Sequence, residues 1–167
     1  MLFRKLQPES LEKKLCLSGE TPIRHNIASL DEVDEIRAAE VADLDNDGDL
    51  DILSASFNDG KIAWYENTNG KGAFGPQQII ATVNGANAVR TADLDNDGDL
   101  DVISSAFNDG SIAWYQNDGH GIFSSSKRVG TVNFVNGIDV SDVDNDGDID
   151  ILSIDPFNKT FWHQNLN

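Results

Sequence analysis

The sequence predicts an all-β protein built from three copies of one structural unit. Three observations support this fold class. The nine residues DLDNDGDLD at 43–51 recur unchanged at 93–101 and return as DVDNDGDID at 142–150. Each copy is followed by runs rich in Ile, Val and aromatic residues, which favour strands. The segments 42–66 and 92–116 differ at only six of 25 positions, so the repeat extends well beyond the acidic stretch.

Each acidic stretch has the pattern of a cation-binding loop. Asp occupies positions 1, 3, 5 and 9, Gly occupies position 6, and a further Asp at position 7 can supply its backbone carbonyl. Ca2+ takes roughly six to eight oxygens at about 2.3–2.6 Å, and alternate residues of a curled loop can point inward. We therefore predict about three Ca2+ per chain. The proposed metal-binding residues are Asp43, Asp45, Asp47, Asp49, Asp51, Asp93, Asp95, Asp97, Asp99, Asp101, Asp142, Asp144, Asp146, Asp148 and Asp150.

Two other interpretations of these loops are weaker. An EF-hand needs an acidic ligand at position 12, where this chain has Ser54, Ser104 and Ser153. The residues that follow are also β-rich, which argues against a flanking helix. A polar loop without an ion would press five carboxylates together within nine residues and would not need such strict alternation. The sequence therefore favours a calcium loop between two strands.

The loop pattern, followed by a β-rich run and by IAWYEN at 62–67, resembles the FG-GAP/VCBS repeats of integrin α-chain heads and many bacterial secreted proteins. The resemblance covers residues 22–167. It implies a calcium-bearing β-propeller, usually extracellular, whose loops or faces bind other molecules. We therefore expect residues 21–167 to form three four-stranded propeller blades.

The first repeat should contain four strands. The first strand leads into the acidic loop and the second strand follows it. Asn58-Asp59-Gly60 should form a tight hairpin between the second and third strands, because these residue types tolerate positive φ. The expected strands are Arg37–Ala42, Asp51–Phe57, Lys61–Glu66 and Gln77–Thr82.

The second and third repeats follow at spacings of 50 and 49 residues. The second keeps the turn, at Asn108-Asp109-Gly110, and should place its fourth strand near Lys127–Val129. In the third, Asn158-Lys159-Thr160 replaces the turn and the sequence stops after the third strand. The third repeat therefore has no fourth strand of its own.

The N-terminal region supplies a surplus strand. Residues 1–20 differ in composition from the repeats and are expected to form a leader, either a short helix or a disordered segment. Residues 22–29 resemble 76–83, the outer strand of the first repeat. Because propellers carry roughly four to eight blades, we expect this strand to complete the third blade of a second chain. The chain would form a homodimer or another homo-oligomer by strand exchange; the alternative is a piece of a longer propeller.

Charge and composition exclude several partners. Lys and Arg number 12 against 29 Asp and Glu, and the net charge is −17. Such a surface disfavours nucleic acid and anionic membranes, and no run approaches the about 18 apolar residues of a membrane span. One cysteine, Cys16, allows no intrachain disulfide. The first residues lack the apolar core of a signal peptide, so the extracellular location is expected from the resemblance alone.

The remaining motifs favour binding over catalysis. Trp64, Tyr65, Trp114, Tyr115 and Trp162 lie on strands that should pack against neighbouring blades, so core packing is their simplest role. No GxSxG motif or His-rich metal motif occurs, and we expect no enzyme activity. The expected function is a calcium-binding scaffold for protein or carbohydrate binding and adhesion. The alternatives are a lectin-like propeller, with the aromatic residues lining a sugar groove, or an accessory domain of a secreted enzyme.

Overall fold

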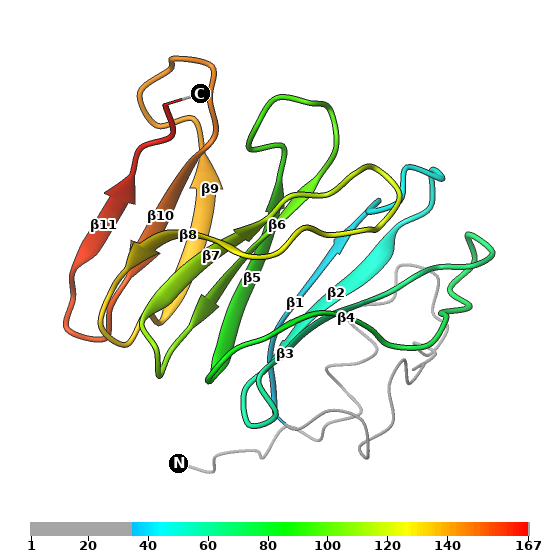
Figure 1. Ribbon diagram of the computed structural model, residues 1–167, viewed down its shortest axis with the longest axis horizontal. Coiled ribbons are helices and arrows are strands. Elements are labelled where there is room, and N and C mark those ends of the chain that lie inside the picture. The colour runs from blue at the N-terminus through cyan, green and yellow to red at the C-terminus, as the bar shows by residue number, and fades with distance from the viewer. Residues whose placement is uncertain (1–34, 167) are drawn as a thin grey trace, which may run out of the picture.

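The computed structural model describes residues 35–166, and this part of the chain is entirely β-structure and loops. Eleven strands form three antiparallel sheets, which stand side by side in chain order (Figure 1). The expected all-β fold is therefore confirmed, and the three sheets are consistent with the repeats in the sequence. None of the described residues forms a long apolar helix of the kind that spans a bilayer.

The first sheet contains β1 (Ile36–Ala42), β2 (Asp51–Ser56), β3 (Lys61–Tyr65) and β4 (Gln78–Thr82), paired in that order. These are the four expected strands, with ends shifted by one residue. The expected hairpin lies between β2 and β3, where Gly60 has a φ of 70°. A Cβ at Gly60 would collide with the carbonyl oxygen of Val83, so this turn requires glycine.

The second sheet repeats the first. It contains β5 (Ala86–Ala92), β6 (Asp101–Ala106), β7 (Ser111–Tyr115) and β8 (Lys127–Thr131), again paired in that order. The fourth strand begins at the expected residue and extends two residues further than expected.

The third sheet contains three strands among the described residues: β9 (Gly137–Ser141), β10 (Asp150–Ile154) and β11 (Thr160–His163). Strand β10 lies between the other two. Among the described residues, no further strand pairs with β9 or β11 in this sheet. The expected strand at 22–29 and the expected leader at 1–20 lie outside the described residues.

A hydrophobic core lies between each pair of neighbouring sheets. Alternation along each strand sends one set of side chains toward each neighbour. Leu53, Ile62 and Trp64 of the first sheet pack with Val102 and Tyr115 of the second. The side chains in between on β6 and β7 point the other way, toward the third sheet. The second sheet is therefore buried on both faces.

The second core lies between the second and third sheets. Ile103 and Ile112 of the second sheet cluster with Ile138 and Ile151 of the third. The first strands of the three sheets are also neighbours, since β5 contacts both β1 and β9. This arrangement places the three acidic loops, each of which follows a first strand, along one edge of the molecule (Figure 1).

Candidate metal centres

Each acidic loop joins the first and second strands of its sheet and brings three carboxylates together. In every group, one oxygen from each carboxylate lies within 4.8 Å of the other two, which is close enough to share one cation. The groups are Asp43, Asp45 and Asp51; Asp93, Asp95 and Asp101; and Asp142, Asp144 and Asp146. These nine are among the predicted ligands.

The loops owe their curl to two positions with positive φ. Gly48, at position 6, has a φ of 92°, a conformation that glycine adopts readily. Asn46, at position 4, has a φ of 59°, and Asn96 and Asn145 match it at 59° and 60°. Asn adopts this region more readily than most residues, so position 4 has a structural role that the ligand pattern does not reveal.

The position-1 carboxylates hold each loop closed. Oδ1 and Oδ2 of Asp93 accept hydrogen bonds from the backbone amides of Asp97 and Gly98, at 3.1 and 3.0 Å. Asp142 accepts the equivalent pair in the third loop. These bonds turn the backbone around the carboxylate group, which brings position 3 back toward position 1.

The position-9 carboxylates tie each loop to the end of its third strand. Both oxygens of Asp51 accept backbone hydrogen bonds, from Leu44 at 3.0 Å and from Asn67 at 2.8 Å. Asp101 and Asp150 make the same two bonds in their own repeats. All three carboxylates are at most 1% exposed. Because a carboxylate oxygen has two lone pairs, these residues can still bind a cation.

In the second and third loops, the position-7 carboxylate contacts the preceding loop and lies outside its own carboxylate group. The side-chain amide of Asn46 donates to Asp99 at 2.7 Å, and that of Asn96 donates to Asp148 at 2.8 Å. We call these two contacts the loop bridges. Asp49, Asp99 and Asp148 were predicted to offer their backbone carbonyls, and their side chains lie outside the three carboxylate groups.

Other predicted ligands are also placed outside the groups. Asp47 and Asp97, at position 5, are absent from the first two groups, and Asp150 is absent from the third. Oδ1 of Asp47 instead accepts a hydrogen bond from the amide of Asp49 at 2.8 Å. Position 5 therefore stabilises the loop backbone in this conformation.

The environment of the carboxylates disfavours several negative charges. Desolvation, followed by the charge of neighbouring carboxylates, raises the pKa of Asp95, and the same factors outweigh a backbone hydrogen bond to raise that of Asp45. Desolvation raises the pKa of Asp101 to about 6, although two backbone hydrogen bonds oppose it. Oδ1 of Asp43 and Oδ1 of Asp95 are buried without a hydrogen-bond partner. A bound cation would offset the repulsion and satisfy both oxygens.

The position-9 carboxylates do not all titrate alike. Desolvation also raises the pKa of Asp51. At Asp150 desolvation acts in the same direction, but the backbone hydrogen bonds from Asn165 and Val143 outweigh it and the pKa is lowered. The backbone hydrogen bonds therefore decide the direction of the pKa shift at Asp150.

In the second and third repeats, the residue directly after the third strand reaches the position-3 carboxylate. Nε2 of Gln116 donates to Asp95 at 2.5 Å, and Nε2 of Gln164 donates to Asp144 at 2.6 Å. The first repeat has Glu66 at this place. This role was not predicted from the sequence, although the pair Glu66 and Gln116 is one of the six differences between the first two repeats.

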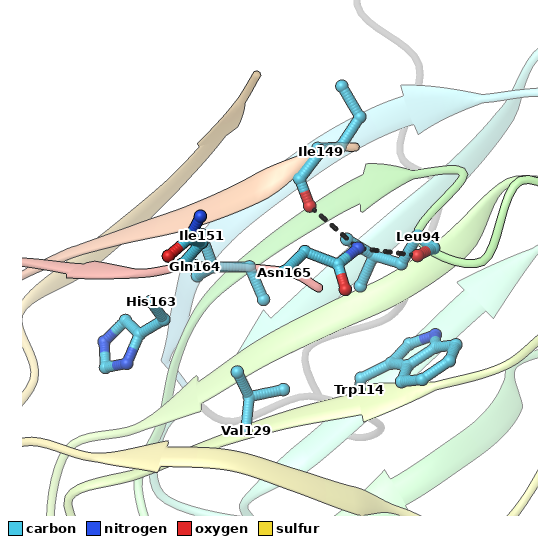
Figure 2. Close-up of a pocket in the computed structure, with 8 residues that line it drawn as sticks. All are labelled: Leu94, Trp114, Val129, Ile149, Ile151, His163, Gln164 and Asn165. Atoms are coloured by element: carbon cyan, nitrogen blue, oxygen red, sulfur yellow. Dashed lines mark hydrogen bonds between the residues drawn. The ribbon is translucent and has the colours of Figure 1, made fainter. Parts of the chain in front are cut away.

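Figure 2 shows a second contact that crosses between repeats. Nδ2 of Asn165 donates to the carbonyl of Leu94 in the preceding loop at 2.8 Å. Asn117 makes the same bond to the carbonyl of Leu44, at 2.7 Å. We call these two contacts the strand bridges. The adjacent pocket, between Trp114 and His163, is about 80 Å³, far below the volume of a typical ligand site.

Most of the aromatic side chains on the third strands are buried. Trp64, Tyr65 and Tyr115 are at most 3% exposed, which confirms their predicted core role. Trp114 is half-buried. For Trp162 the core prediction is wrong, because it is 46% exposed on the outer face of the third sheet, where no described residue covers it. The five do not form one open row.

Comparison with known families agrees with this repeat geometry. The model of the FG-GAP-like repeat matches residues 43–104 and 101–153, which together include all three acidic loops. A search of curated proteins found no significant match. FG-GAP repeats are typical of extracellular proteins. The chain belongs to the FG-GAP-like repeat family.

Proposed function

We propose that the protein is a calcium-stabilised, propeller-type scaffold for binding other molecules. The observation that carries this proposal is the convergence of three carboxylates in each of three equivalent loops. Two of these loops also contain a buried carboxylate oxygen without a hydrogen-bond partner. Such oxygens are costly unless a ligand satisfies them.

Calcium fits the donor set better than other common metals. All candidate donors are oxygens, which hard cations prefer, and the groups contain no His or Cys. Mg2+ usually keeps several waters and takes one or two carboxylates, whereas Ca2+ accepts more protein oxygens. In the first loop the ligands would be Asp43, Asp45, Asp47 and Asp51 with the backbone carbonyl of Asp49. The second and third loops would use the equivalent residues.

The role proposed for calcium is structural. The loops lie along one edge and the loop bridges connect them, so each ion would stabilise its own loop and, through the bridge, the position of the next sheet. The three sheets would act as propeller blades whose first strands lie innermost. The adjacency of β1, β5 and β9 supports this arrangement.

The biological role that we propose is binding of a protein or carbohydrate outside the cell, without catalysis. Support comes from the family, whose repeats are typical of extracellular proteins. Extracellular calcium is about millimolar, which suits the weaker classes of calcium site.

The calcium proposal is tested by thermal unfolding and by counting bound ions. Native mass spectrometry in calcium should show three ions per chain, one for each carboxylate group. Asp45→Asn should reduce stability in calcium and have little effect in EGTA. If calcium is present at about 100 times its Kd, one site contributes about 2.7 kcal/mol. Asp139→Asn is the matched control, because Asp139 lies outside the loops and its exposed ion pair with Arg90 should contribute equally in both buffers. Equal losses for Asp45→Asn in both buffers would refute its role as a ligand.

A further inference from the structure

The two ends of the row of sheets carry opposite halves of the contacts that join neighbouring repeats. Within the chain each contact occurs twice, as the loop bridges and the strand bridges. In a loop bridge, the earlier repeat supplies the Asn donor and the later repeat supplies the Asp acceptor. In a strand bridge, the later repeat supplies the Asn donor and the earlier repeat supplies the carbonyl.

The end groups of the series have no such partner. Asn145, in the third loop, is the counterpart of Asn46 and Asn96, but its exposed side chain makes no hydrogen bond with a described residue. At the other end, the carboxylate of Asp49 accepts no hydrogen bond from the described residues, whereas Asp99 accepts one in a loop bridge. A donor thus remains at one end and its acceptor at the other.

The strand bridges also leave a donor at one end of the row of sheets and an acceptor at the other. Asn67 corresponds to Asn117, but among the described residues its Nδ2 donates only to Leu50 of its own loop. The carbonyl of Val143 in the third loop corresponds to the acceptor carbonyl of Leu44. The donor here belongs to the first sheet and the acceptor to the third, the reverse of the loop bridge.

The outer face of the third sheet is apolar and exposed. Trp162 is 46% exposed, whereas its counterpart Trp64 is 3% exposed under the second sheet. Ile154 is 44% exposed, whereas its counterpart Ala55 is fully buried. This face therefore has the side chains of an internal interface without a neighbouring sheet in the described part of the chain.

The first sheet carries an exposed apolar residue at the matching place. Val41 is 60% exposed on β1. Its counterpart Val140, on β9, packs against the second core and faces the preceding sheet. By the same geometry Val41 faces the side on which a preceding sheet would stand.

We propose that the outer face of the third sheet binds the first sheet of a second copy of this chain. Asn145 would donate to Asp49 of the second copy, and Asn67 of that copy would donate to the carbonyl of Val143. Each end carries the hydrogen-bonding partners of the other end and not those of a second copy of the same end. The contact is therefore head-to-tail. Two copies of three sheets each would close into a ring of six, within the roughly four to eight blades of propellers.

This inference does not depend on bound calcium, because both kinds of bridge form between protein atoms alone. Failure of either proposal can therefore be recognised separately. Calcium occupancy is measured by ion count, and association is measured by mass and sedimentation.

The test uses one substitution at each end and one elsewhere. Ile154→Glu and Val41→Glu each place a charge on one of the two proposed faces. Ile122→Glu is the matched control, because Ile122 is 66% exposed on the loop between β7 and β8 and belongs to neither end sheet. Native mass spectrometry and sedimentation velocity are run over a series of concentrations in calcium. Circular dichroism verifies that each variant is folded.

The unmodified chain and Ile122→Glu should have twice the 18.2 kDa mass of one chain. Ile154→Glu and Val41→Glu should both fall to the single-chain mass while remaining folded. A folded, monomeric unmodified chain would overturn the proposal. A dimer that only one of the two end substitutions dissociates would also overturn it, because that result requires a contact between two copies of the same face.

Discussion

The side-chain amide of Asn46 donates a hydrogen bond to the carboxylate of Asp99, 53 residues away, at 2.7 Å. The two residues occupy different positions of equivalent loops, so the bond connects neighbouring candidate metal centres directly. The same amide also contacts the carbonyl of Gly119 at 3.3 Å. The positive φ of Asn46 thus serves two purposes, because it curls its own loop and aims its side chain at the next.

The loop bridge predicts a charge-dependent coupling between the first two repeats. Asn46→Asp replaces the donor with a carboxylate facing Asp99, and we expect a loss of about 1–3 kcal/mol in the free energy of unfolding. Urea unfolding measures this loss.

The double variant Asn46→Asp with Asp99→Asn is the control, because it restores a donor and an acceptor in reversed order. It should recover much of the lost stability. If the two substitutions instead add, the residues do not interact energetically.

Asp51 should stabilise the fold even without a metal ion. Its two oxygens accept the amides of Leu44 and Asn67, and Asp51→Ala would leave both amides without their partner. We expect a loss of about 2–6 kcal/mol, with about 1–3 kcal/mol for each of the two unsatisfied amides. The loss should be present in EGTA as well as in calcium, unlike that of Asp45→Asn. A loss confined to calcium would show that Asp51 acts only as a ligand.

The strands of the first two repeats could be predicted from sequence because each depends on local signals. The β-rich runs that follow the acidic loops define β2 and β6, and glycine at Gly60 and Gly110 defines the following turns. The carboxylate groups could be predicted for a similar reason, since position 1 and position 3 are brought together by the curl of one short loop.

Other features depend on neighbours that the local pattern does not contain. The core prediction holds for Trp64 and fails for Trp162, although both occupy the same strand position, because only Trp64 has a described sheet beside it. The bridge from Asn46 to Asp99 requires the relative placement of two sheets. The backbone bonds of Asp51 require the end of the third strand to lie beside the loop.

The pKa of Asp101 predicts an unusual pH dependence in the absence of calcium. Desolvation raises this pKa from 3.8 to about 6 in the folded state, so the folded protein binds more protons than the unfolded protein between these values. Stability should therefore fall as pH rises from about 4 to about 6. Urea unfolding in EGTA measures this slope, and Asp101→Asn should reduce it.

Calcium should reverse the direction of this dependence. The metal binds deprotonated carboxylates, so its contribution to stability increases with pH.

For the measurement in EGTA, Asp150→Asn is the comparison variant, because the pKa of Asp150 is lowered by its backbone hydrogen bonds. This variant should retain the fall in EGTA. A slope in EGTA that is unchanged by Asp101→Asn would contradict the assignment.

Glu66 should give the first loop a higher calcium affinity than the second. Gln116 donates to the position-3 carboxylate of the second loop, and Glu66 occupies the corresponding place in the first repeat. A carboxylate there cannot donate and adds a negative charge near the ion, and ligand charge is one determinant of calcium affinity. Glu66→Gln should therefore weaken the first site, and Gln116→Glu should strengthen the second, each by about fivefold or about 1 kcal/mol.

A calcium titration monitored through the NMR signals of the Gly48 and Gly98 amides measures the two affinities separately, because each glycine belongs to one loop. In each variant the unaltered loop is the internal control, and equal shifts in both affinities would show that the substitution acts on the whole fold and not on its own site.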